Sequence, residues 1–216
     1  SYNLGLVAVG TAAQWTTAVV STGAAAAQTI NPGSLTVLKS SSTPSTGNIA
    51  PGAQNEKLAV WDVTVKGEDL RTTSMTFAVT PTDNSGADGQ TFDRTKITGC
   101  VLRDKNSTVV AGPVDVSTAN TAVFSTTVTF PVGTASYALH CNIASTAGSL
   151  DTVLAGLTPT NLANVTGVSS GNTVTPTPAT AVNGNTLTVK GAVLTVTNMT
   201  TPAASTVVTG AQSIYL

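Results

Sequence analysis

Residues 57–66 read Lys-Leu-Ala-Val-Trp-Asp-Val-Thr-Val-Lys. In an extended chain, Ala59, Trp61, Val63 and Val65 would share one face, because successive side chains of a strand point to opposite sides. β-Branched and aromatic residues also favour strands, since they pack well on a pleated surface. The stretch therefore predicts a half-buried strand in which Trp61 anchors the core.

The same alternation recurs along the chain between clusters of Gly, Pro, Asn and Ser. It predicts strands at 34–38, 57–66, 73–80, 95–103, 107–111, 121–130, 135–144, 151–156, 164–168, 173–176, 185–190 and 193–197. The runs 121–130 and 135–144 are expected to form an antiparallel hairpin, and 169–186 a linker-like excursion. The predicted fold class is all-β, an Ig-like or jelly-roll-like β-sandwich with terminal strands that can be exchanged between subunits.

The composition limits the possible partners. Of the 216 residues, 41% are hydrophobic, only 9% are charged, and the formal net charge is −1. No cluster of Lys and Arg is visible along the sequence, which excludes nucleic acid as a partner because phosphate neutralisation needs a basic face. No apolar run approaches the roughly 18 residues of a membrane-spanning helix, so no transmembrane segment is expected.

The end of the sequence repeats a part near its beginning. Leu35-Thr36-Val37 matches Leu194-Thr195-Val196, and Gly52-Ala53-Gln54 matches Gly210-Ala211-Gln212 in the same order. The first match has an offset of 159 residues and the second of 158, which a single deletion explains. Ordered self-similarity of this kind is typical of stacked structural units.

The repeat suggests a division into three parts. Residues 1–33 resemble the end of a preceding repeat, 34–186 form the main β-sandwich domain, and 187–216 resemble the start of a next repeat. Strands that lack partners in their own chain must find them elsewhere, because unpaired edges and apolar faces are unfavourable in water.

The 187–216 segment is therefore a candidate strand donor to a neighbouring copy. A head-to-tail contact of this kind builds an open filament. The alternative is a fragment of a multi-repeat chain whose last strands fold back onto their own domain. The donor-strand candidates are Leu187, Val189, Val193, Leu194 and Val196.

Residues Ser34–Leu70 contain Leu-Thr-Val, Ser-Ser-Ser-Thr-Pro, Ala-Pro-Gly-Ala-Gln-Asn and Leu-Ala-Val-Trp-Asp-Val-Thr-Val-Lys-Gly-Glu-Asp-Leu. This pattern resembles the repeated Ig-like β-sandwich modules of bacterial cell-surface proteins, including S-layer-like and adhesin-like chains. The resemblance implies an exported structural role without catalytic residues. The expected function is that of an extracellular structural protein, the subunit of a pilus-like surface filament whose partners are copies of itself. Alternatives are an S-layer lattice module, a fragment of a multi-repeat surface adhesin, and a virion tail or capsid protein.

Few residues suggest chemistry. Cys100 and Cys141 are either a disulfide or two buried thiols. His140 is the only histidine and is expected on the solvent side of its strand, so neither a catalytic triad nor a two-histidine metal site can be assembled from motifs. The protein is not expected to be an enzyme.

Two further groups of candidates come from loops and sequons. Asp83, Asp88 and Asp93 supply hard oxygens that could bind calcium, but their spacing does not match an EF-hand and a solvated turn is the better explanation. No other cofactor is expected. The Asn-x-Ser/Thr pattern makes Asn106, Asn164 and Asn198 glycosylation candidates.

Overall fold

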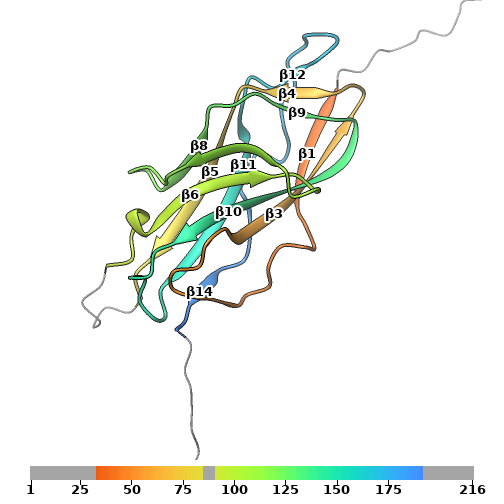
Figure 1. Cartoon of the computed structure of the whole chain (residues 1–216). Coiled ribbons are helices and arrows are strands. Elements are labelled where there is room, and N and C mark those ends of the chain that lie inside the picture. Colours follow the sequence, from red (N-terminus) through yellow and green to blue (C-terminus); the bar gives the residue numbers. More distant parts are fainter. Residues whose placement is uncertain (1–32, 85–90, 192–216) are drawn as a thin grey trace, which may run out of the picture.

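The computed structural model of the chain describes residues 33–84 and 91–191, which form two packed β-sheets with a smaller third sheet at one end (Figure 1). The expected all-β sandwich is confirmed. The strands are β1 (Ser34–Lys39), β2 (Asn48–Ile49), β3 (Glu56–Lys66), β4 (Leu70–Thr72), β5 (Ser74–Thr82), β6 (Ile97–Arg103), β7 (Val109–Val114), β8 (Thr121–Phe124), β9 (Val128–Phe130), β10 (Gly133–Ile143), β11 (Thr152–Ala163), β12 (Thr166–Gly167), β13 (Val182–Asn183) and β14 (Leu187–Val189). One turn of 3-10 helix, η2 (Arg94–Lys96), precedes β6.

The first sheet has the order β1-β3-β10-β6-β7, and the second has the order β2-β14-β11-β5-β8, with β13 also paired to β11. Strand β3 lies between β1 and β10 and is antiparallel to both. The third sheet, β12-β4-β9, is short. Most neighbours within a sheet are distant in sequence, so the fold depends on non-local pairing.

The core lies between the first two sheets. Trp61 of β3 is completely buried, and its ring centroid is 5.1 Å from that of Phe77 on β5. Phe77 also meets Phe124 of β8 edge-on at 5.7 Å. The indole nitrogen of Trp61 donates a 2.8 Å hydrogen bond to the carbonyl oxygen of Val182. The alternation in 57–66 thus predicted the correct buried face, and Trp61 is a core residue.

The expected hairpin between 121–130 and 135–144 is wrong. The first run divides into β8, which pairs with β5 in the second sheet, and β9, which pairs with β4 in the third. Strand β10 pairs instead with β3 and β6 in the first sheet. Phe124 and Phe130 are both buried, as an alternating pattern over 121–130 predicts. Such a pattern cannot show that the chain passes from one sheet to another between these two residues.

The expected linker-like excursion at 169–186 is also wrong. Val174 is buried, and the segment runs along the free edge of β1. There, Val37 donates its backbone N–H to the carbonyl oxygen of Thr177 at 2.8 Å, and Thr177 donates back to Leu35 at 2.9 Å. The prolines in this segment prevent a regular strand, but they do not keep it off the sandwich.

Two of the donor-strand candidates have partners in their own chain. Leu187 and Val189 belong to β14, which pairs antiparallel to β11 and parallel to β2. Their side chains are 2% and 0% exposed, within the common core. Strand β14 thus completes the second sheet of the described body, beyond the expected domain end at 186. The other candidates, Val193, Leu194 and Val196, lie outside the described residues.

The described body begins and ends at opposite poles, as Figure 1 shows. At the entry pole, Gly33 lies beside Leu70 and Lys66, close to the third sheet. At the exit pole, Leu150 donates its backbone N–H to the carbonyl oxygen of Val189, two residues before Gly191. The described chain therefore starts at one end of the long axis of the sandwich and finishes at the other.

Replacing Leu187 by Ala should lower the free energy of unfolding of the full chain by about 2 to 5 kcal/mol, because it removes buried methyl groups from the core. Urea denaturation followed by tryptophan fluorescence measures this. The matched control is Leu38→Ala, whose side chain is 60% exposed and whose loss should change stability by at most about 0.5 kcal/mol. Equal stability of Leu187→Ala and the wild type would show that β14 does not contribute to its own sandwich.

The loop at 167–172 is held at the entry pole by Glu68. Its carboxylate accepts hydrogen bonds from the backbone N–H groups of Ser169 and Ser170, each 2.9 Å, and from the Ser170 hydroxyl. These hydrogen bonds, that of the Ser170 side chain first, lower the pKa of Glu68 below its ordinary value of 4.5.

Since the folded-state pKa is the lower one, the stabilisation from Glu68 is present above pH 4.5 and is lost as the pH falls through the folded-state pKa. Carbon-detected NMR titration should show the carboxyl of Glu68 titrating below 4.5. In Glu68→Gln, the free energy of unfolding should fall less at acid pH than in the wild type, because this side chain no longer titrates. A titration at or above the ordinary value would contradict this role for the loop contacts.

Candidate functional site

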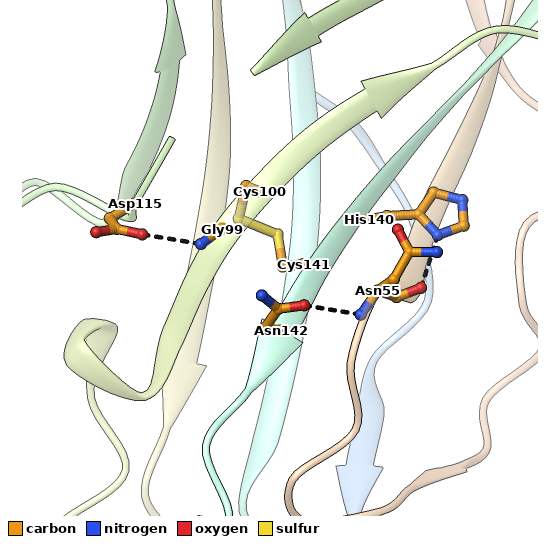
Figure 2. Close-up of a disulfide and its surroundings, with 7 residues drawn as sticks. All are labelled: Asn55, Gly99, Cys100, Asp115, His140, Cys141 and Asn142. Atoms are coloured by element: carbon orange, nitrogen blue, oxygen red, sulfur yellow. Dashed lines mark hydrogen bonds between the residues drawn. A yellow bond between two sulfur atoms is a disulfide. The ribbon is translucent and has the colours of Figure 1, made fainter. Parts of the chain in front are cut away.

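Cys100 and Cys141 form a disulfide that joins the neighbouring strands β6 and β10 of the first sheet (Figure 2). Both cysteines are fully buried, and their Cα atoms are 4.1 Å apart. Of the two alternatives that the sequence left open, the structure shows the disulfide. Because Cys141 points into the core, its neighbours His140 and Asn142 on β10 lie on the outer face of the sheet.

Asn55 connects the outer side chains around this disulfide. Its backbone N–H donates to Oδ1 of Asn142 at 2.8 Å, and its carbonyl oxygen lies 2.9 Å from Nδ1 of His140 (Figure 2). On β6, the backbone N–H of Gly99 donates to Asp115 at 2.8 Å. Gly99 has φ of +57°, and a Cβ there would lie 2.6 Å from the Asn142 side chain. A larger residue at 99 would therefore be strained and would disturb this network.

His140 is half-buried on the outer face, which agrees with the expected solvent side of the strand. Burial, the largest cause, lowers the pKa of His140 below 6.5, and the positive charges of Arg103 and Lys57 lower it further. The hydrogen bond to Asn55 and the carboxylate of Glu56 act in the opposite direction. Because a carbonyl oxygen can only accept, Nδ1 carries the hydrogen and Nε2 of the neutral ring has a free lone pair.

A polar depression of about 340 Å³ lies on this face next to His140. We call it the basic depression, because Lys57 of β3, Arg103 of β6 and Lys105 of the β6–β7 turn contribute to its wall. These are three of the nine Lys and Arg residues in the chain. The sequence shows no basic cluster, since 46 positions separate Lys57 from Arg103; the pairing of β10 with both β3 and β6 brings them together.

The calcium candidates are not assembled into a site by the described residues. Asp83 is exposed after the end of β5, and Asp88 lies outside the described residues. Asp93 caps η2, where Oδ1 accepts from the backbone N–H of Thr95 at 2.9 Å and from its hydroxyl. These hydrogen bonds lower the pKa of Asp93. Within 33–84 and 91–191, no three His, Cys, Asp or Glu side chains are grouped as metal ligands.

The glycosylation candidates differ in accessibility. Asn106 is exposed in the β6–β7 turn, where a side chain can carry a glycan. Asn164 has φ of +51°, and its side-chain nitrogen donates to the Thr73 hydroxyl at 3.2 Å, so the acceptor nitrogen is engaged within the fold. Asn198 lies outside the described residues.

No protein-family model and no curated protein sequence matches this chain. In the part of the chain that the structure describes, no helix is long and apolar enough to cross a membrane. The features that the described geometry offers for function are thus the two poles of the sandwich, the buried disulfide and the basic depression.

Removing the disulfide should destabilise the sandwich without changing its fold. The bond closes a loop with a sequence separation of 41, and the entropy of such a loop in the unfolded chain corresponds to about 4 kcal/mol. The double variant Cys100→Ala/Cys141→Ala should lose roughly this much stability in urea denaturation. A thiol reductant should lower the stability of the wild type and leave the double variant unchanged. Insensitivity of both proteins to reductant would contradict a stabilising disulfide.

Proposed function

We propose that this protein is a structural subunit of an assembly exported to the cell surface, in which successive sandwich units follow one another head to tail. The observation that carries the proposal is that the described body begins next to β1 and ends after β14, at opposite ends of the sandwich (Figure 1). If the chain enters each unit at one pole and leaves it at the other, further units can be joined in a line without a reversal of the chain direction.

The phase of the sequence repeat supports this arrangement. With the offset of 159 residues, the counterpart of Ser34, the first residue of β1, is Val193. Strand β14 ends at Val189, so only residues 190–192 separate one unit from the start of the next. Three residues span at most about 10 Å, which would hold the exit pole of one unit close to the entry pole of its successor.

The same alignment gives the remaining donor candidates a specific place. Leu194 and Val196 correspond to Leu35 and Val37, whose side chains are 1% and 0% exposed beside β3. In the proposed assembly, the segment from Val193 therefore occupies the β1 position of the next unit. In a second copy of this chain that position is held by the copy's own β1, so donation between molecules requires the donated segment to displace that strand rather than to fill a vacant groove.

Extracellular location is part of the proposal. A fully buried disulfide in a chain with two cysteines is consistent with folding in an oxidising compartment. A surface with few charges suits close contact between subunits, because few hydrated ionic groups have to be desolvated. The proposal therefore assigns this protein a structural rather than an enzymatic role.

The test compares the full chain with a version that ends at Gly191, which keeps β14 and therefore all described core residues. Multi-angle light scattering and negative-stain microscopy should show linear assemblies of the full chain and monomers of the shorter one. The full-length variant Leu194→Asp/Val196→Asp should also be monomeric, because neither carboxylate can enter the buried face next to β3.

The outcomes separate the alternatives. Planar crystals would favour an S-layer lattice, and closed particles or tubes would favour a virion component. Monomers of all three proteins at equal thermal stability would contradict assembly through 192–216. A loss of thermal stability in the version ending at Gly191 would instead show that this segment serves its own domain.

A further inference from the structure

We propose that the basic depression binds an acidic polysaccharide through the carboxylate groups of its sugar residues. This inference does not depend on the proposed filament. It rests on three features of the outer face of the first sheet: uncompensated ammonium groups, a fixed guanidinium, and a wall rich in hydroxyl groups.

The ammonium groups of Lys57 and Lys105 make no hydrogen bond or ion pair with another residue in the described ranges. Both side chains are exposed at the rim of the depression. Each therefore keeps its hydrogen-bond donors for a ligand. Two such groups at one concave site attract anions more strongly than isolated surface lysines, because their fields add.

Arg103 contributes charge in a fixed position. Its Nε and one terminal nitrogen donate to Oδ1 of Asn55 at 3.3 and 3.1 Å, and the other terminal nitrogen donates to the carbonyl oxygen of Ser107 at 2.8 Å. None of these partners is a carboxylate, so the positive charge is not neutralised by them. Arg103 therefore strengthens the local positive field.

The nearby carboxylates reduce this field only in part. Asp104 lines the depression, but its Oδ1 already accepts the backbone N–H groups of Asn106 and Thr108, each at 2.9 Å. With Lys57, Arg103 and Lys105 against Asp104, the lining residues have a formal charge of +2 when His140 is neutral. Asp62, which accepts the hydroxyl of the lining Ser136 at 2.6 Å, and Glu56, which acts on His140, are two further carboxylates that reduce this field.

The rest of the wall favours a hydroxylated ligand. Three serines, Ser42, Ser107 and Ser136, line the depression together with His140, and no Phe, Tyr or Trp side chain does so. The hydroxyl of Ser136 donates to Asp62 at 2.6 Å, and that of Ser42 is hydrogen-bonded to Ser40 at 2.8 Å. A hydroxyl can also accept two hydrogen bonds, so these groups keep acceptor capacity for the hydroxyl groups of a sugar. The depression therefore lacks the large aromatic side chains on which successive nucleobases stack. The depression is open to solvent, as required for a polymer chain that continues past the site at both ends.

His140 makes the binding pH-dependent. In the free protein, burial, Arg103 on β6 and Lys57 on β3 hold its pKa below 6.5, while Asn55 and Glu56 oppose this shift. A bound carboxylate raises this pKa, because it stabilises the imidazolium. Binding is then coupled to proton uptake, and the affinity should rise as the pH falls through the pKa of the bound state toward that of the free state.

The test uses the full chain with an oligogalacturonate of about ten residues, at low salt, in isothermal titration calorimetry, and neutral dextran as the uncharged control. Lys57→Gln/Lys105→Gln should bind the oligogalacturonate about tenfold more weakly, because two charge-assisted contacts are lost. The matched control Lys66→Gln/Lys190→Gln changes the net charge equally at two exposed lysines outside the depression and should bind like the wild type. In His140→Gln the rise in affinity at lower pH should be absent.

Equal weakening in both double variants would overturn the proposal, because it would show attraction to net charge alone. No binding of oligogalacturonate by the wild type would also overturn it. Inorganic polyphosphate serves as the second anion. If it bound with the same dependence on Lys57 and Lys105 while oligogalacturonate did not, the assignment to a carboxylated sugar would be wrong. None of these results depends on whether the chain forms filaments.

Discussion

The buried ring of Trp61 is the contact on which the rest of the sandwich depends. It lies on β3, the strand that pairs with both β1 and β10, and it packs across the core against Phe77 of the second sheet. Its N–H group would be costly to bury alone, and the carbonyl oxygen of Val182 satisfies it. One side chain therefore joins the two sheets and also fixes the segment that crosses toward β14.

The disulfide has a different part in the same core. It joins β6 to β10, which are already paired, so it does not connect the two sheets directly. It stabilises the fold because a cross-link between distant residues lowers the conformational entropy of the unfolded chain. This matters in a chain with 9% charged residues, since the sandwich has few ionic contacts to draw on and relies on apolar burial and backbone pairing.

The sequence was informative wherever one local pattern determined the outcome. Alternation in 57–66 identified the buried face of β3, and the two cysteines were candidates for the disulfide that the structure shows. It failed where the outcome depended on distant partners. The run 121–130 places Ala122, Phe124, Val128 and Phe130 in one alternating phase, yet β8 and β9 join different sheets. The basic depression was invisible for the same reason, because strand pairing across long separations brings Lys57 and Arg103 to one face.

The two faces of the first sheet differ, since one packs into the core and the other carries polar and charged side chains. Along β10, Leu139, Cys141 and Ile143 point into the core, whereas His140 and Asn142 face outward. Inward positions tolerate little change, because core packing is dense. Outward positions carry little of the core energy, so charged and polar side chains can collect there at low cost to folding. The disulfide links β6 and β10 inside, and the same strands carry Arg103 and His140 outside. The pairing of β6 with β10, to which the disulfide adds a cross-link, thus builds part of the core and also brings two walls of the basic depression to one face.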